Sequence, residues 1–498
     1  MIARHTGLYK NWLIVLVVFV AISLILFSGS TGRIFLSDDY CTLYNIVVNN
    51  SVMIPTFFRP VGDLTLRWTY RLAGLDPFYF YLINILLHAV NSFLVYWFCR
   101  LWLRDDGRVH LFSIVAGLIF LTYPSHAEAI LWTIGRGVSL ATFFSLLGMI
   151  AFVSRLNTNF KYLLVCTSYF VALACYESVL LLPFVLFTLS RTSSKKRHMM
   201  WSMLLLVTLF VHIYLRFVFT GGIWQAYNGI IFAKDIIQYL SAFVKIILRL
   251  FIPPFDHPLL FTICGTVALS LVSVILYRNR KRFETDSVFA RTFVLCVTGL
   301  LVTILVSISF GMSTRTSEGD RLMYLPSVFY AMLIALLIST VLHSGKAVAM
   351  ATVAMVVFQV SFLMINQNNW KRASEYAEKV IGGIREHKER PLYLINLPSD
   401  TRGAYIFRNC LNQALLFNNV DTTGVRIVNV IQSTEIEKRK SLIVPERQGE
   451  DIFVWPNTLL EMENSNVVSI NHDSTIKAPV PLRSFLYWNK QDLVQMSE

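Results

Sequence analysis

The stretch WLIVLVVFVAISLILFSG at residues 12–29 decides the fold class of this chain. It carries no charged side chain, and as a helix it is long enough to cross a hydrocarbon layer of about 30 Å. Arg4 and Lys10 precede it, and no small-x-small cleavage site follows it. We therefore predict an uncleaved signal anchor whose N-terminus lies in the cytoplasm.

Similar apolar runs recur along the first 365 of the 498 residues, and the whole chain is 55% hydrophobic. Only 15% of the residues are charged, whereas a soluble domain has about 25%. The sequence therefore predicts an α-helical polytopic membrane protein with about eleven transmembrane helices. The expected spans are 12–29, 78–101, 110–124, 138–154, 161–176, 178–190, 200–219, 259–277, 288–311, 322–341 and 347–365.

Residues 236–252 are also apolar, but Lys245 and Arg249 interrupt them. A span at this position would place the following basic loop, RNRKR at 278–282, outside the cytoplasm. We therefore expect this helix to lie along the outer membrane face rather than to cross it.

The net charge of +14 does not indicate a nucleic-acid partner, because the basic residues gather in short loops between apolar runs. This distribution is the positive-inside pattern of cytoplasmic loops. The residues concerned are Arg100, Arg104 and Arg108; Arg155 and Lys161; Arg191, Lys195, Lys196 and Arg197; and Arg278, Arg280, Lys281 and Arg282. We expect these loops in the cytoplasm, the intervening loops outside it, and membrane lipids as the surroundings.

The composition changes after Gln367, which divides the chain into two predicted domains. We predict a transmembrane domain at 1–366 and a soluble extracytoplasmic domain at 367–498. An amphipathic helix over 368–390 precedes the strand-like run PLYLINLP at 391–398, and VRIVNVI, DIFVWP and NVVSI are further strand-like runs. The second domain is therefore expected to have a small α/β or α+β fold.

The seven cysteines show no CxxC or metal-ligand spacing. Five of them lie in or beside apolar runs and are interpreted as small packing residues. Cys41 and Cys410 fall on the predicted outer side. A disulfide between them is compatible with that side, but their spacing gives it no support.

Polar residues inside the spans have a structural interpretation. Asn84, His88 and Asn91 form a stripe on the expected helix 78–101, which is typical of a hydrogen-bonding seam between helices. No glycine-rich phosphate loop, nucleotide fingerprint or metal-ligand cluster accompanies them. We therefore expect no nucleotide cofactor.

The predicted outer loops hold an unusual collection of ionisable residues, beginning with the adjacent acids in SDDY. A carboxylate can take a proton from an acceptor hydroxyl, and arginines can hold a phosphate through paired hydrogen bonds. Each residue taken alone could equally be a solvated loop residue or a helix cap, but charges near a membrane tend to be functional. The collection comprises Asp38, Asp39, Arg59, Asp63, His126, Glu128, Arg136, Glu177, Lys245, Arg249, Arg315, Glu318, Asp320 and Arg321.

Five stretches in order give the chain a resemblance to a known superfamily. They are SDDY; FFRPVGDLTLRWTYRLAGLDPFYFYLINILLHAVNSFLVYW; YPSHAEAILWTIGRGVSLATFFSLLGMIAF; CYESVLLLPFVLF; and EGDRLMYLPSVFYAMLIALL. The chain resembles the GT-C integral-membrane glycosyltransferases, especially protein O-mannosyltransferases of the transmembrane, tetratricopeptide-containing type and their bacterial relatives. The resemblance covers roughly residues 30–340 and implies a GT-C fold.

The resemblance implies an inverting transfer of a sugar from a polyprenyl-phosphate-linked donor to an acceptor hydroxyl at the outer face. It implies a catalytic acid in the first outer loop, which matches Asp38 as the base, with Asp39 as its partner or substitute. Arg59 matches the arginine that precedes a proline in this loop. Arg136 follows the His-x-Glu segment and Arg321 precedes Tyr-x-Pro-Ser, so these three arginines are the phosphate candidates.

Further positions complete the expected site. His126, Glu128 and Glu177 match positions that could orient the base or contact sugar, while Arg249 and Arg315 are additional substrate-binding candidates. No metal cofactor is expected, although some superfamily members bind a divalent cation at their acidic site.

Each of these assignments has a structural alternative. Arg321 could anchor a helix start, Arg136 could form a salt bridge with Glu128, and His126 could cap a helix.

The tail lacks the repeats of the eukaryotic relatives, so the acceptor stays open among glycans, lipids and proteins. This compactness favours a bacterial inner membrane, with the second domain on the periplasmic side. Two other functions are compatible with the sequence: a flippase or transporter of lipid-linked glycan, and a noncatalytic GT-C relative acting in assembly. A transporter would place polar groups at the bilayer midplane and often shows internal repeats, whereas the acids and arginines here gather on one predicted face.

Overall fold

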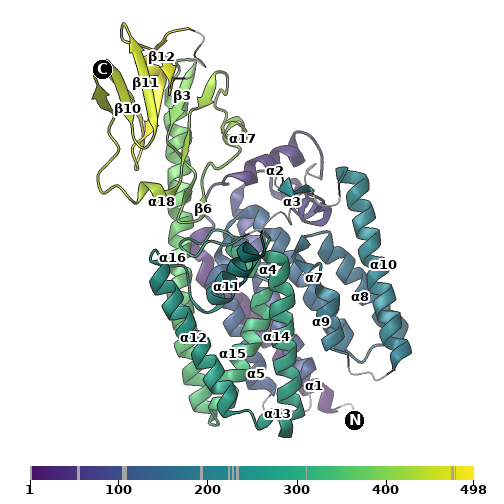
Figure 1. Ribbon diagram of the computed structural model, residues 1–498. Coiled ribbons are helices and arrows are strands. Elements are labelled where there is room, and N and C mark those ends of the chain that lie inside the picture. Colours follow the sequence, from purple (N-terminus) through teal and green to yellow (C-terminus); the bar gives the residue numbers. More distant parts are fainter. Residues whose placement is uncertain are drawn as a thin grey trace. The chain divides into compact units, whose positions relative to one another are not determined.

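The computed structural model divides the chain into two compact units, Met1–Gly32 with Asn45–Gln367, and Arg33–Tyr44 with Asn368–Glu498 (Figure 1). It describes residues 3–52, 57–103, 109–190, 194–222, 225–226, 229–230, 235–309, 311–472, 476 and 478–497. Of the basic loop residues considered above, Arg104, Arg108 and Arg191 lie outside these ranges. Residues 33–44 cluster with the C-terminal part of the chain rather than with the helices that flank them.

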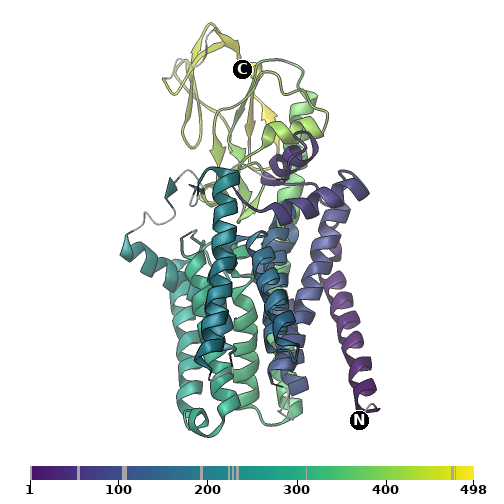
Figure 2. The same ribbon diagram turned by 90° about the vertical axis from the view of Figure 1, so that its right-hand side faces the viewer.

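The first unit is helical, and its long helices run side by side (Figure 2). Within the described ranges, seven helices are long and apolar enough to cross a membrane. They lie in α1 (Ala3–Phe27), α4 (Pro77–Trp102), α7 (Arg136–Val153), α10 (Lys195–Thr220), α12 (Pro258–Arg278), α14 (Ser287–Ser307) and α16 (Gly345–Glu386). An eighth span is formed if α5 (Val109–Leu121) and the segment Pro124–Leu131 count as one helix bent by 51°.

The described ranges therefore support seven or eight spans by length and composition, fewer than the eleven expected. The other three expected spans correspond to α8 (Thr158–Leu173), the broken segment Glu177–Thr188 and α15 (Pro326–Val341). Helices α8 and α15 have 16 residues each, fewer than the roughly 20 that a hydrocarbon core requires. Most of α15 is buried inside the unit. A helix surrounded by protein is apolar all round, as a membrane span is, so composition alone does not separate the two.

Helix α11 (Ile236–Phe251) lies across the upright helices rather than along them (Figure 2). Ile246, Leu248 and Leu250, near its C-terminal end, are buried, whereas Ile236 and Ile237, at its start, are exposed. These exposed side chains suit contact with an apolar layer. The expectation that this helix rests on the outer membrane face stays a prediction.

Helix α4 is largely buried in the first unit and carries the predicted polar seam. Asn84 Nδ2 donates to the Ile130 carbonyl at 3.2 Å, and Asn91 Nδ2 donates to the Ser139 carbonyl at 2.9 Å. His88 Nδ1 lies 2.8 Å from the Tyr324 hydroxyl. The stripe therefore ties α4 to neighbouring segments through hydrogen bonds, which confirms its structural interpretation.

The second unit contains a mixed sheet and an antiparallel sheet, which agrees with the expected α/β or α+β class. The mixed sheet has the order β15-β14-β3-β7, in which only the edge strand β15 is antiparallel to its neighbour. Its strands are β3 (Leu392–Ile395), β7 (Val425–Ile427), β14 (Phe485–Trp488) and β15 (Leu493–Gln495). All four residues of β3 are buried, as expected for a parallel strand covered on both faces.

The antiparallel sheet has the order β13-β12-β11-β10-β9. Its strands are β9 (Glu446–Gln448), β10 (Asp451–Val454), β11 (Thr458–Glu463), β12 (Asn466–Ile470) and β13 (Val480–Pro481). The sequence runs that predicted strands fall on β3, β7, β10 and β12, so these four predictions are confirmed.

Candidate functional site

Glu177 lies between two arginines of the first unit. Arg59 precedes α3 (Pro60–Ala73) and donates from Nε and Nη2 to Glu177 Oε2 at 3.0 and 2.8 Å. Arg216, on α10, donates from Nη1 to the other oxygen, Oε1, at 3.0 Å. The carboxylate therefore links the start of α3 to α10 and fixes the direction of the Arg59 side chain.

Tyr176 connects this ion pair to a second one. The Arg59 guanidinium lies 4.0 Å from the centre of the Tyr176 ring, while Arg321 Nε donates to the Tyr176 hydroxyl at 3.5 Å. Arg321 also contacts Glu128 through its side chain, and its backbone N–H donates to Glu128 Oε2 at 2.9 Å. We call these groups, with Arg216 and Glu177, the Tyr176 cluster.

Arginines outnumber carboxylates among the named groups of the Tyr176 cluster. Its three guanidiniums and two carboxylates sum to one positive charge. The side chains of Arg59 and Arg321 are 21% and 16% exposed. Part of each side chain is therefore accessible to a ligand at the surface of the unit. Trp132 lies beside Arg321, with the guanidinium 5.1 Å from its ring centre. Aromatic surfaces and bidentate donors of this kind suit an anionic group attached to an apolar or sugar body.

Electrostatics keep Glu177 ionised. Burial raises the pKa of this carboxyl, but the adjacent Arg59 and Arg216 guanidiniums outweigh that effect and lower the pKa to about 2. Glu177 is therefore unsuited to be a general base near neutral pH, because it holds its proton too weakly. Its geometry and charge instead orient Arg59.

Arg249 and Asp320 form a separate ion pair that is almost wholly buried, with both side chains 1% exposed. Arg249 also donates to the backbone carbonyls of Ser313 and Ile252, each at 3.2 Å. Burial raises the pKa of Asp320 to about 7, against the opposing effect of Arg249. This pair ties α11 to the segment that carries Arg321.

Arg136 is buried among neutral acceptors at the start of α7. It donates to Asn84 Oδ1 at 2.7 Å, to the Thr69 hydroxyl at 2.8 Å and to the Phe80 carbonyl at 3.0 Å. Its residue exposure is 1%. The guanidinium therefore joins α3, α4 and α7 in the interior, and Glu128, its predicted salt-bridge partner, is engaged by Arg321 instead.

The two remaining candidates of the first unit differ in exposure. His126 is fully buried, and its Nε2 lies 2.7 Å from the Ser327 hydroxyl. It packs among aromatic rings, including that of Tyr324, whose centre is 4.3 Å away. Arg315 is exposed in the loop before Asp320. Neither residue contributes a contact to the Tyr176 cluster among those that the described ranges define.

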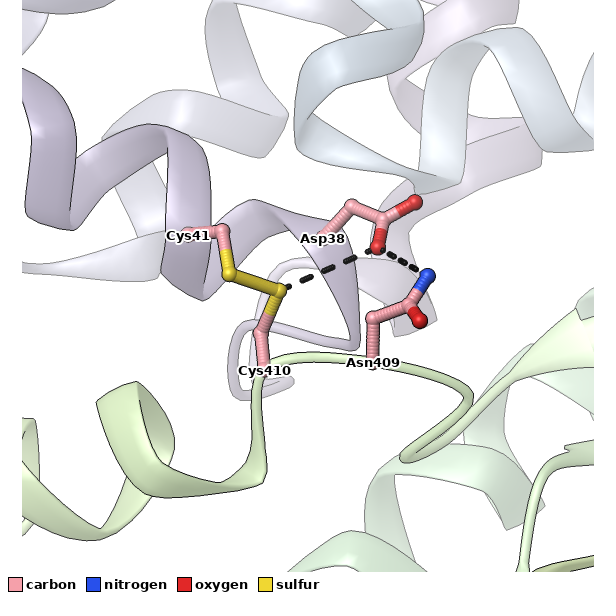
Figure 3. Close-up of a disulfide and its surroundings, with 4 residues drawn as sticks. All are labelled: Asp38, Cys41, Asn409 and Cys410. Carbon is pink, nitrogen blue, oxygen red and sulfur yellow. Dashed lines mark hydrogen bonds between the residues drawn. A yellow bond between two sulfur atoms is a disulfide. The ribbon is translucent and has the colours of Figure 1, made fainter. Parts of the chain in front are cut away.

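Asp38 and Asp39 lie at the start of α2 (Asp38–Val47), in the part that belongs to the second unit. Asp39 is buried, and its Oδ2 accepts the Leu36 backbone N–H at 3.2 Å. It therefore reaches back over its own helix start, as a capping residue does. Asp38 is half-buried and accepts a hydrogen bond from Asn409 Nδ2 at 2.9 Å (Figure 3).

Sequence reasoning missed four of the groups that contact the candidate residues: Tyr176, Arg216, Trp132 and Asn409. Arg216 had a usable signal, since a charged residue within the expected span 200–219 requires a partner. Tyr176, Trp132 and Asn409 had none, because aromatic and amide residues are common in such loops. No group of three or more His, Cys, Asp or Glu side chains in the described ranges could hold a metal ion.

Comparisons with known proteins give a partial match in sequence. No family model matches the chain. It is 32% identical over 102 residues to the protein O-mannosyl-transferase TMTC2 of Homo sapiens, which covers 20% of this chain and 12% of that protein. With human TMTC3 it is 33% identical over 95 residues, covering 19% and 10%. The chain thus matches about a tenth of the length of these relatives, and the predicted resemblance is confirmed over that part.

Among solved structures, the chain is similar to ArnT from Cupriavidus metallidurans bound to undecaprenyl phosphate. The TM-score is 0.40 at 16% sequence identity, and the alignment covers 85% of this chain and 90% of that one. The apo state of the same protein gives a TM-score of 0.37 at 15% identity.

Proposed function

We propose that this protein is a membrane glycosyltransferase that moves a sugar from a polyprenyl-phosphate-linked donor to an acceptor hydroxyl outside the cytoplasm. The observation that carries the proposal is the Tyr176 cluster, where two partly exposed arginines flank one tyrosine. The sequence similarity to O-mannosyltransferases supports the same class of reaction.

The charge of the Tyr176 cluster suits such a donor. A sugar linked to a polyprenyl chain through one phosphate is a phosphodiester with a single negative charge, which would balance the single positive charge of the cluster. When the sugar leaves, the phosphate gains a second negative charge. Arg59 and Arg321 would stabilise that developing charge without a rearrangement, because Glu177 and Glu128 already hold them in place.

Asp38 is the proposed general base. It would take the proton of the acceptor hydroxyl while the hydroxyl oxygen attacks the anomeric carbon. The bond from that carbon to the phosphate oxygen breaks, its electron pair leaves with polyprenyl phosphate, and the configuration inverts. Asp38 is preferred over Asp39 because the Asp39 carboxylate is buried and caps its own helix.

The contacts suggest other roles for several of the arginines and for His126. Arg136 and Arg249 are proposed to hold the helical unit together, since both are buried and fully engaged. His126 is proposed as a packing residue that bonds Ser327. Arg315 is exposed and stays a candidate for contact with a head group or acceptor.

The proposed compartment follows from the Cys41–Cys410 disulfide of the second unit. Such bonds persist in oxidising surroundings, including the bacterial periplasm. We therefore propose that the second unit lies outside the cytoplasm and that the protein belongs to a bacterial inner membrane. The acceptor is proposed only as a hydroxyl of a glycan, lipid or protein.

The test uses the purified full chain with a panel of polyprenyl-phosphate sugars and follows release of polyprenyl phosphate. Asp38→Asn should abolish release while Asp39→Asn retains part of it, provided that both variants remain folded. Asp421→Asn, at an exposed turn of the second unit, is the matched control. Donor hydrolysis should be followed as well, so that a missing acceptor does not mask activity.

Two results would reject the proposal. One is wild-type protein that neither transfers nor hydrolyses any donor, and the other is release that neither aspartate substitution reduces. Movement of intact donor between the leaflets of a vesicle, without release of polyprenyl phosphate, would instead favour a flippase.

A further inference from the structure

Residues 33–44 are held in place by backbone and side-chain groups from the C-terminal part of the second unit. The Ile34 N–H donates to the Ser374 hydroxyl at 3.1 Å, and the Ser37 N–H donates to the Ile406 carbonyl at 2.9 Å. These contacts fix the chain directly before Asp38. The segment is therefore held by residues more than 330 positions further along the sequence.

The first turns of α2 are anchored as well. The rings of Tyr40 and Tyr44 each lie 6.3 Å from that of Phe417, on α17 (Leu411–Phe417). Cys41 forms a disulfide with Cys410, the residue that precedes α17 (Figure 3). The bond joins positions 369 residues apart, so it connects the two parts of the chain that make up this unit.

The disulfide and Asp38 share one face of α2. Residues three positions apart on a helix are neighbours, and Asp38 and Cys41 have that spacing. Asn409 directly precedes Cys410 on the segment across the disulfide from α2, and Figure 3 shows both of their side chains directed at α2. Fixing Cys410 therefore also fixes Asn409, whose Nδ2 donates to Asp38 Oδ1 at 2.9 Å. The Cys410 sulfur lies 3.9 Å from the same oxygen.

We propose that Asn409 is a positioning residue for the Asp38 carboxylate, and that the Cys41–Cys410 disulfide keeps it in place. This inference rests on the proposed function, in which Asp38 is the base. The amide occupies Oδ1 and limits rotation of the carboxylate, which leaves Oδ2 to receive the acceptor proton. The C-terminal unit is then part of the catalytic apparatus, and reduction of one disulfide lowers turnover.

Two substitutions at Asn409 separate positioning from packing. Asn409→Ala removes the donor and should lower kcat about 10-fold with the donor KM unchanged, since a misplaced catalytic group mainly affects the chemical step. Asn409→Asp has nearly the same shape but sets a second carboxylate against Asp38, so it should lower kcat further than alanine does. If Asn409 served only to pack against its neighbours, Asn409→Asp, which keeps the shape, would retain a higher kcat than Asn409→Ala. Asn466→Asp, at the first residue of β12, controls for the added charge.

The disulfide is tested by reduction and by the double variant Cys41→Ser/Cys410→Ser. A phosphine reductant should lower kcat of the wild type toward that of the double variant. It should leave the double variant unchanged, because the other five cysteines are already free thiols. Hydrogen exchange of the amides of residues 33–44 supplies a readout that needs no activity, and both reduction and the double substitution should speed it.

The outcomes separate this inference from the proposed function. Unchanged kcat and unchanged exchange after reduction overturn the inference, as does Asn409→Asp that turns over faster than Asn409→Ala. Wild-type protein that releases no polyprenyl phosphate from any donor overturns the proposed function. In that case the exchange of residues 33–44 still decides whether the disulfide anchors the segment.

Discussion

Glu177→Gln removes the negative charge between Arg59 and Arg216 while keeping the size of the side chain. Glutamine approximates the protonated carboxyl, so the effect can be worked from the pKa of Glu177. That pKa falls from 4.5 to about 2 in the folded protein. The difference corresponds to about 3 kcal/mol of folded-state stability at neutral pH, similar to the loss when one partner leaves a buried ion pair.

The pH dependence has a definite direction. Because the folded-state pKa lies below the ordinary value, the ionised carboxylate contributes its full stabilisation above about pH 4.5. That contribution disappears as the pH falls through about 2. At pH 3 the gap between wild type and Glu177→Gln should therefore narrow to about 1 kcal/mol.

The assay is thermal unfolding of the purified chain in detergent, measured for both proteins from pH 7 to pH 3. The variant should melt several degrees below wild type at pH 7, and the two curves should approach each other in acid. Glu284→Gln, an exposed carboxylate on α13 (Arg282–Thr285), should follow the wild type throughout. Equal melting of Glu177→Gln and wild type at pH 7 would refute the ion-pair reasoning.

Three further outcomes are expected. Arg136→Lys cannot reach all the acceptors of the buried guanidinium and leaves some of them unsatisfied, so it should cost about 1–3 kcal/mol in thermal unfolding, whereas Arg315→Lys, which is exposed, should cost nothing measurable. Gly135→Ala would bring a Cβ within 2.8 Å of two backbone oxygens of α6 (Ala127–Leu131), so α6 must shift and the variant should lose about 1–3 kcal/mol in the same assay. Arg59→Ala and Arg321→Ala should each raise the Kd for a polyprenyl-phosphate sugar about 10-fold, measured by direct binding, because each loses charge-assisted hydrogen bonds.

The sequence predicted the membrane class and most helices, because long runs of apolar residues with almost no charge are typical of helices that cross a bilayer. It expected eleven spans, whereas seven or eight stretches of the described ranges have the length and composition of a span, and the two numbers differ where an apolar helix is short and buried in protein. Helix α15 is the clearest case, because its side chains are buried among other helices. Length separates the two environments better than composition does, and the expected range 322–341 included part of a 3-10 turn, η5 (Asp320–Met323), and the connection that follows it.

The sequence predicted many residues of the candidate site, but it did not predict which of them contact one another. Arg59 and Glu177 were both candidates, yet their contact joins positions 118 residues apart. Neither stretch of sequence indicates that its residue pairs with the other. Arg136 looked like Arg321 in sequence, since each lies just before an expected transmembrane helix. The structure separates them by burial: Arg136 donates to neutral acceptors in the interior, whereas Arg321 stays partly exposed beside Trp132.

The segment that carries Asp38 shows why chain order is a poor guide to domain membership here. Residues 33–44 follow the first apolar helix, so their position in the sequence assigns them to the membrane part. Their hydrogen bonds, ring contacts and disulfide instead join them to residues 374–417 of the second unit. A chain cut after Gln367 would keep Asp38 in its sequence but would lose Asn409, Cys410 and Phe417. Inactivity of such a fragment would therefore not show that the C-terminal unit binds the acceptor, because the fragment would also lack the contacts that hold its proposed base.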